Sequence, residues 1–437
     1  MYRLGIILII ATAVMSVNAQ SNLSSTQIDS LTYQQYLNKD YKNLIETSKA
    51  AREQNIDFYY LNYRTAIAYY ELKNYAKAAE FYKKTLSETP DDPILRESLY
   101  YAYLLSGQKE NAAITAETLP PHTLATIGYK PSAVDFVSLS GGYMINDNKP
   151  DILSRLSGYD SLNQYQDMIY TSLTLGLNLS ARSKLKLGYQ LYSTNFEQYN
   201  KNGLVQTDKL KQHQLVAALE ILTKNNISLG VAGGYYNIQI FDNSAIYSRS
   251  NGYGFGPGNA SRASMNSGKT ISAFSALAFL NKRFTYVQPE IAVAYSNFGN
   301  GSQYQGEGSL TYYPLGNLDF YGQTKFAAIY SPNAWKEKQF VFSQSLGVKL
   351  AKPLWLDGSV SIGNHLNYIT ERSFLVYDTY NPINAIAAMS LSYYFKKAMI
   401  SVGYQWQQRE GYAYSTIDYI TYKYNNHLFN IALLWDF

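Results

Sequence analysis

The chain has 437 residues, no cysteine and a formal net charge of +5, from 37 basic and 32 acidic side chains. The lack of thiols excludes disulfides, thiolate metal ligands and a lipidated N-terminal cysteine. The chain also has no basic tract, so nothing in its charge pattern predicts nucleic-acid binding. Charged residues make up only 16% of the chain, below the roughly 25% of soluble domains, and its 44 tyrosines are typical of a lipid–water interface.

The first residues have the pattern of a secretory signal peptide. Arg3 precedes an apolar run from Leu4 to Val14, and small residues at Val17 and Ala19 follow. This order of charge, apolar core and small residues predicts cleavage after Ala19, which removes 1–19. No later stretch is long and apolar enough to be a spanning helix, so any membrane-spanning part is expected to be a closed β-barrel.

From about 25 to 119 the apolar residues recur with a helical period, which predicts helix pairs at about 26–53, 57–88 and 92–117. In the middle pair Tyr75, Ala78 and Tyr82 share one helix face, and Pro90 follows. The pattern resembles the tetratricopeptide repeat, in which a small residue lets two helices approach and bulky ones fill the gap. The residues expected to form the packing or the partner face are Ala66, Tyr69, Tyr75, Ala78, Tyr82, Tyr103 and Ala112.

Such a short repeat array has two interpretations. Its concave face binds a peptide or a partner protein, as the resemblance implies, or the array is a spacer or a plug for the mouth of the barrel.

The rest of the chain has the two-residue period of β-strands. Two prolines at Pro120-Pro121 end the last helix, so 120–132 is expected to be a linker and 133–437 a barrel. Tight connections at 181–182, 224, 281–282, 314–316, 351–352 and 396 alternate with longer ones, which places the helical module and the C-terminus in the periplasm. The fourteen predicted strands are about 133–145, 166–181, 183–196, 209–223, 225–241, 268–281, 282–297, 301–313, 317–329, 337–350, 353–369, 382–395, 397–409 and 424–437.

The last strand has a specific signature. Its apolar residues alternate with small or polar ones, as a lipid-facing barrel wall requires. Its aromatic end resembles the terminal-strand signal that the barrel-assembly machinery reads, which makes that machinery an expected partner. The residues of this signal are Phe429, Ile431, Leu433, Trp435 and Phe437.

The longest outer loop, at 242–267, is rich in glycine and aromatic residues. It caps the mouth or touches a glycan or a partner, or it is simply a disordered loop.

Strand parity turns a set of polar side chains into the lumen: Lys186, Glu220, Glu290, Glu307, Asp319, Lys325, Lys349, Asp357, His365 and Arg409. Five acids against four bases give no field of one sign, so no ion selectivity is expected. Two interpretations remain: the charges pair and fill a lumen that does not conduct, or they line a channel.

No catalytic, cofactor or metal site is expected. None of the four histidines has the spacing of metal ligands. His365 shares the lumen side with Ser361, whereas outer-membrane phospholipases carry a serine–histidine pair on the lipid-facing wall with an orienting partner. We therefore interpret this pair as a polar cluster of the lumen.

The order of the two halves resembles the YaiO-like outer-membrane proteins and, more loosely, exporters of cellulose and other exopolysaccharides. The repeat at Tyr75, Ala78, Tyr82 and Pro90 and the end at Phe437 carry this resemblance. It implies an all-α repeat module followed by a transmembrane antiparallel barrel in the outer membrane of a Gram-negative-type bacterium. Two functions follow as hypotheses: a non-enzymatic scaffold whose repeats dock a periplasmic or envelope protein, or an export or diffusion pore whose repeats recruit the cargo.

Overall fold

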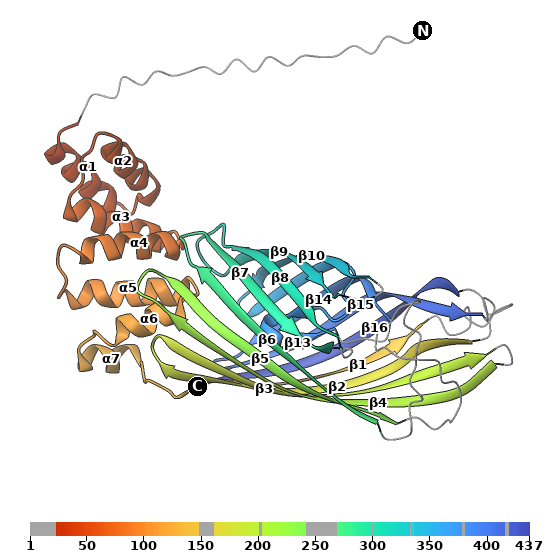
Figure 1. Ribbon diagram of the computed structural model, residues 1–437. Coiled ribbons are helices and arrows are strands. Elements are labelled where there is room, and N and C mark those ends of the chain that lie inside the picture. Colours follow the sequence, from red (N-terminus) through yellow and green to blue (C-terminus); the bar gives the residue numbers. More distant parts are fainter. Residues whose placement is uncertain are drawn as a thin grey trace, which may run out of the picture.

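The computed structural model describes residues 23–147, 161–200, 203–241, 269–298, 301–332, 334, 336–377, 381–415 and 419–437. Within these residues, seven α-helices precede a closed antiparallel barrel of 14 strands (Figure 1). The helical module followed by a 14-strand barrel confirms the predicted fold class, in which three helix pairs were expected. The predicted signal peptide at 1–19 and the glycine-rich loop at 242–267 lie outside the described residues. No helix in these ranges is long and apolar enough to cross a membrane.

The helices form three consecutive pairs and one extra helix. The extra helix corrects the expected linker: Pro121 starts it, because a proline in the first turn loses no helical hydrogen bond, and Gly128 ends it with a φ of 67°. The helices are α1 (Ser25–Leu37), α2 (Tyr41–Glu53), α3 (Tyr59–Glu71), α4 (Tyr75–Leu86), α5 (Pro93–Leu105), α6 (Lys109–Ala116) and α7 (Pro121–Ile127).

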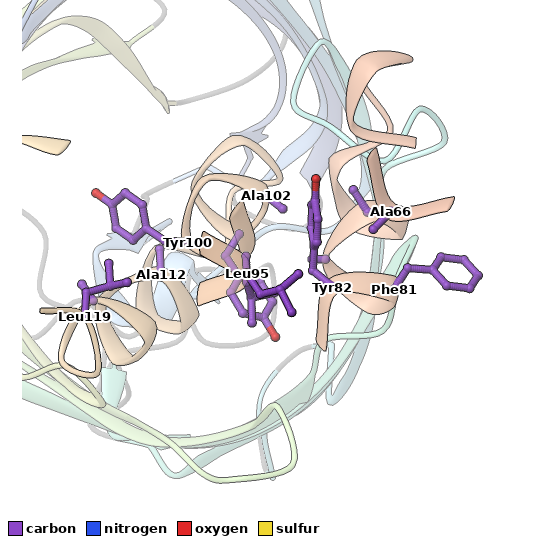
Figure 2. Packing of buried hydrophobic residues seen from close by; sticks show 13 residues of the cluster. Ala66, Phe81, Tyr82, Leu95, Tyr100, Ala102, Ala112 and Leu119 are labelled. Carbon is purple, nitrogen blue, oxygen red and sulfur yellow. The ribbon is translucent and has the colours of Figure 1, made fainter. Parts of the chain in front are cut away.

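Small and aromatic side chains hold the pairs together. Ala66 on α3 and Ala78 on α4 are fully buried, so the two helices can approach closely. Tyr82 fills the space between this pair and Leu95 of the next one (Figure 2). Burial also raises the pKa of Tyr103 to about 12, so its phenol stays neutral in the core.

The barrel strands pair with their neighbours in chain order, and β1 closes the ring against β16. Several strands are longer than predicted, because their outer ends carry polar residues on both faces and break the apolar alternation. The wall consists of β1 (Val134–Asn146), β2 (Ser161–Ser180), β3 (Ser183–Asn200), β4 (Gly203–Leu222), β5 (Ile227–Phe241), β6 (Lys269–Lys282), β7 (Val287–Ser296), β8 (Gln303–Tyr312), β9 (Phe320–Tyr330), β10 (Lys338–Ala351), β11 (Leu354–Gly363), β14 (Ile383–Tyr394), β15 (Ala398–Tyr414) and β16 (Tyr419–Asp436).

The predicted strand at 353–369 is wrong in its second half. β11 ends at Gly363, whose φ of 124° suits glycine. The following residues leave the wall and form a short hairpin of β12 (Ile369–Thr370) and β13 (Leu375–Val376). Alternation alone could not predict this departure, because an inward-folded segment also alternates polar and apolar residues.

The outside of the wall is apolar. Phe429, Ile431, Leu433 and Trp435 on β16, and Phe437 directly after it, are all between 44% and 58% exposed. Past Phe429 the outward positions of this strand become polar, beginning with His427. The apolar residues therefore form a belt of limited height, as a hydrocarbon layer requires.

The helical module lies at the end of the barrel that carries the short turns and the C-terminus (Figure 1). The backbone amide of Ala76 donates a 2.8 Å hydrogen bond to the carbonyl of Gly316, in the turn between β8 and β9. The Asn317 amide donates to the Lys73 carbonyl at 2.9 Å, and Asn74 donates to the Tyr286 hydroxyl at 3.0 Å. Specific hydrogen bonds thus seat the module on this end.

Candidate functional site

The segment from Asn364 to Pro382 enters the lumen as a plug, described apart from 378–380. Its tip is the 3-10 turn η2 (Glu371–Ser373), whose three residues have φ values of 49°, 57° and 71°. Side chains other than glycine rarely adopt this left-handed backbone, so the surrounding contacts must hold it.

Ion pairs on the far wall hold the tip. Arg372 donates to Glu220 on β4 at 2.5 Å and to Glu290 on β7 at 3.0 Å. Its guanidinium also lies 3.9 Å from the centroid of the Phe279 ring. In the ring of 14 strands, β4 lies seven strands from β11, where the plug begins, so the plug spans the lumen from one side to the other.

A second charged cluster holds the hairpin beside the tip. The Lys325 ammonium on β9 lies 3.1 Å from Glu371 of the plug and 3.6 Å from Glu307 on β8. The hydroxyl of Tyr368, also in the plug, donates to Glu307 at 2.7 Å. Every carboxylate and cation in this cluster has a partner of opposite charge, as groups removed from bulk water require.

Glutamine side chains of the wall bind the plug backbone. Gln305 both donates to the carbonyl of Ile369 at 2.6 Å and accepts from its amide at 3.1 Å. Gln190, on the β3 side, donates to the carbonyl of Phe374 at 2.6 Å. A Cβ at Gly188 would lie 2.6 Å from the Phe374 ring, so only glycine lets the plug approach β3 this closely.

His365 and Ser361 anchor the root of the plug. The Ser361 hydroxyl lies 2.6 Å from Nε2 of His365, and Nδ1 lies 2.8 Å from the carbonyl oxygen of Ile383. The imidazole is almost fully buried, and no carboxylate among the described residues bonds to it. A backbone carbonyl in the place of an orienting acid makes this a structural contact and not a nucleophile with its base.

Of the remaining lumen residues, Lys349, Asp319 and Asp357 lie away from the plug tip, whereas Arg409 and Lys186 lie close to the plug. Lys349 pairs with Asp319 at 3.0 Å near the short-turn end, and Asp357 accepts a hydrogen bond from Tyr321. Arg409 donates to Gln407 at 2.8 Å and to the carbonyl of Asn381, in the plug, at 3.3 Å. Lys186 lies 5.9 Å from the Phe136 ring centroid and interacts electrostatically with Arg372 and Glu371 of the plug tip.

Sequence reasoning missed Glu371 and Arg372, which supply the plug's own charges. The one signal in the sequence is that two charged residues are adjacent. Neighbouring residues of a strand point to opposite sides of the wall, so one of the two would face lipid if this segment were a strand.

The turn between α5 and α6 lies across the mouth of the barrel. The carbonyl of Ser106 accepts a 3.2 Å hydrogen bond from Arg283, in the turn between β6 and β7. Glu110 pairs with Lys184 on β3 at 2.9 Å, and the Lys109 ammonium lies 3.6 Å from Asp436 on β16. β16 and β7 lie on opposite sides of the ring, so this turn bridges the opening.

The residues predicted for the helical module are split by burial. Ala66, Ala78, Tyr82, Tyr103 and Ala112 are buried in one cluster. Tyr69 stacks on Phe81 and Tyr75 packs edge-on against Tyr70, with ring centroids 5.6 and 5.1 Å apart. The five buried residues pack the repeats and cannot contact a partner, whereas Tyr69 and Tyr75 are partly exposed.

The arrangement is a barrel closed at two levels. A cavity of about 250 Å³ is lined by Tyr321, Asp357 and Asn430 among other residues of the barrel strands. In the parts of the chain that the structure covers, no three His, Cys, Asp or Glu side chains are grouped to hold a metal ion.

No family model and no curated protein matches this sequence. Among solved structures, a FadL homologue of Pseudomonas aeruginosa is similar at 10% identity with a TM-score of 0.45, covering 70% of this chain and 90% of that one. The toluene transporter TodX of Pseudomonas putida gives 10% identity, a TM-score of 0.43 and coverages of 71% and 91%. A bacterial polysaccharide outer membrane secretin gives 8% identity, a TM-score of 0.37 and coverages of 70% and 100%.

Proposed function

We propose that this protein is a non-enzymatic barrel of the outer membrane whose helical module binds a partner protein in the periplasm. The apolar belt on the outer wall supports the membrane location, since water would not favour so many exposed phenylalanine, leucine and isoleucine side chains. The short turns on the module side support a periplasmic module, because barrels of this class have short periplasmic turns and longer outer loops.

The observation that carries the proposal is an exposed apolar face on the first helices of the three pairs. Tyr33 on α1, Tyr60 on α3 and Ile94 on α5 are 46%, 57% and 65% exposed. Tyr60 and Ile94 are 34 residues apart, one repeat length, so they occupy equivalent positions and line up along the array. Leu37 on α1 and Leu105 on α5 are also exposed, at 53% and 39%, and the equivalent position of α3 between them is Glu71.

Among the described residues, the hydrogen bonds and ion pairs that join the helices to the barrel come from other positions. The contacts to the barrel come from the α3–α4 turn, α4, the α5–α6 turn and α6. We define the exposed row at Tyr33, Leu37, Tyr60, Ile94 and Leu105 as the apolar face. Exposed apolar side chains that recur from repeat to repeat favour binding of another protein, with the aromatic side chains as anchors.

The barrel serves as the anchor. Both closures of the lumen support this role, because a barrel filled by its own plug needs no passage to hold the module at the membrane.

The test is co-isolation from detergent-solubilised membranes. Tyr60→Glu with Ile94→Glu places two charges on the apolar face, and we expect loss of a stoichiometric partner at unchanged barrel yield. Lys42→Glu with Lys83→Glu, on exposed positions of α2 and α4, is the matched control and should keep the partner. Equal recovery of the partner from both double variants would refute docking on this face.

A gated pore is the second candidate, and the chemistry of the plug favours it. The plug contacts the wall through ion pairs and glutamine hydrogen bonds, and also through apolar side chains such as Ile369 and Val376. The polar contacts can be exchanged for water at little net cost, so they are the part of the plug that favours release. Planar-bilayer recording of variants without the plug separates this candidate from the scaffold.

A further inference from the structure

A shallow apolar groove of about 540 Å³ lies on the outward face of the wall, over β2 to β5. In the strand register, Leu187 lies beside Ala217, and Ala217 lies beside Gly233. The side chains shrink along this row, so the groove is deepest over Ala217 and Gly233.

Two tyrosines mark the outer end of the groove. Tyr189 and Tyr235 flank Leu215 on the neighbouring strands, and all three side chains are exposed. The Tyr189 hydroxyl lies 2.8 Å from Nδ1 of His213, and the Tyr235 hydroxyl lies 2.9 Å from Oγ of Ser272. Both hydroxyls meet polar groups while the rings border the groove, so the edge of the apolar belt passes between Leu215 and His213.

Beyond this edge, β4 carries His213, Lys211 and Lys209 at successive outward positions. We define these three residues as the basic strip. The Lys211 ammonium lies 5.7 Å from the Phe241 ring centroid. Neither lysine has an ion pair with a carboxylate of the described residues.

Two acids on the neighbouring strands β2 and β3 have hydrogen-bond partners of their own. The carboxylate of Asp167, two strands away, accepts a 2.7 Å hydrogen bond from Asn195, and Glu197 is buried and accepts one from Tyr199. Among the described side chains, therefore, no carboxylate pairs with the two lysines of the basic strip at the rim of the apolar groove.

We propose that the groove and the basic strip bind a phosphate-bearing glycolipid of the outer leaflet. An acyl chain lies over Ala217 and Gly233, and a phosphate lies against Lys209 and Lys211. Lys211 is about 13 Å along the strand from Leu215, so a single lipid that crosses the belt edge can contact both. Lysine binds phosphate as a compact point charge, and basic clusters at a membrane edge attract anionic lipids.

The assignment to the outer leaflet rests on the membrane orientation of the proposed function. The basic strip lies toward the end of the barrel away from the helical module (Figure 1).

The test is native mass spectrometry of the purified, folded full-length protein in detergent, titrated with bisphosphorylated lipid A. We expect one retained lipid per barrel. Lys209→Gln with Lys211→Gln should raise its dissociation constant about tenfold. Ala217→Phe fills the groove without changing any charge and should weaken retention to a similar extent.

Two control variants carry the same kinds of substitution at other places on the barrel wall. Lys338→Gln with Lys423→Gln removes two exposed lysines near the same end of the barrel, on β10 and β16, and should retain the lipid. Ala387→Phe places a ring on β14 and should also leave binding unchanged.

Equal weakening by the control pair would overturn the site in favour of general charge attraction. Retention of phosphatidylglycerol as tight as that of lipid A would overturn the assignment to an outer-leaflet glycolipid. Heat-modifiable migration verifies that each variant is folded. Failure of the lipid experiment would not affect co-isolation of a partner protein through the apolar face. The lipid site and the partner site can therefore be refuted independently.

Discussion

Arg372 carries the densest set of contacts in the plug, since one guanidinium bonds two carboxylates from different strands and stacks on a ring. All three charged side chains are less than a third exposed. Without the arginine, Glu220 and Glu290 would repel each other across the space that the plug tip now fills.

Arg372→Gln should therefore favour the open lumen. Loss of charged hydrogen bonds of this kind costs about 1–3 kcal/mol, equivalent to a roughly 5- to 150-fold shift between two states. Single-channel recording should show more frequent openings than in the parent protein. Lys349→Gln removes a lumen cation that pairs away from the plug and should change little. If neither variant opened more often than the parent protein, the ion pairs of Arg372 would not be what holds the plug.

In the helical module, the single residue Ala78 is important for stability. It is fully buried between helices, and overpacking of such a position costs about 1–3 kcal/mol before any charge is added. Ala78→Arg should unfold the module locally, seen as protease sensitivity of 25–119, and abolish co-isolation of the partner while folded barrel stays near normal.

Ala125→Arg is the control for this variant, because Ala125 is exposed on α7. Wild-type recovery of the partner with a module that proteases digest would show that the barrel, and not the repeats, holds the partner.

At the scale of elements, β16 closes the ring against β1 and also presents the aromatic end. Trp435→Ser with Phe437→Ser removes two outward aromatic residues, 49% and 56% exposed, from the face that must be apolar in lipid. We expect a severalfold loss of inserted barrel and accumulation of periplasmic aggregates or fragments, measured by heat-modifiable migration and fractionation.

Asn430→Ser with Ala432→Ser changes two positions of the opposite, inward parity on the same strand and should insert normally. A normal yield of folded barrel from the aromatic double variant would contradict an assembly signal in this strand.

At the scale of the whole molecule, the two closures lie in series along one lumen. The intact protein should show little steady conductance, because the plug and the α5–α6 turn both obstruct the passage. Replacing 364–382 with a short glycine–serine linker should give partial or flickering conductance, and additional removal of 23–119 should give large, steady channels. Steady ohmic channels from the intact protein would contradict both closures at once.

Removal of 23–119 alone should leave conductance low, since the plug keeps its contacts with β4, β7, β8 and β9. This variant identifies the plug as the tighter of the two closures.

The sequence by itself determined the two-part architecture, the strand number and the outward aromatic end. Each follows from a local period or a local pattern, because alternation over ten residues and small-to-large spacing on a helix face are readable without knowing any distant contact. Strand alternation also predicted that Glu220, Glu290, Glu307 and Lys325 face the lumen. In the structure these side chains lie in the two charged clusters around the plug.

Only the tertiary structure decided that residues after Gly363 leave the wall, that Arg372 meets Glu220 and Glu290 from across the ring, and that the α5–α6 turn bridges the mouth. These features depend on contacts between residues more than 80 positions apart, and their energies come from pairs that no local pattern specifies. Whether a segment continues in the wall or turns into the lumen depends on the side chains that it can contact there. Those side chains come together only when the barrel closes.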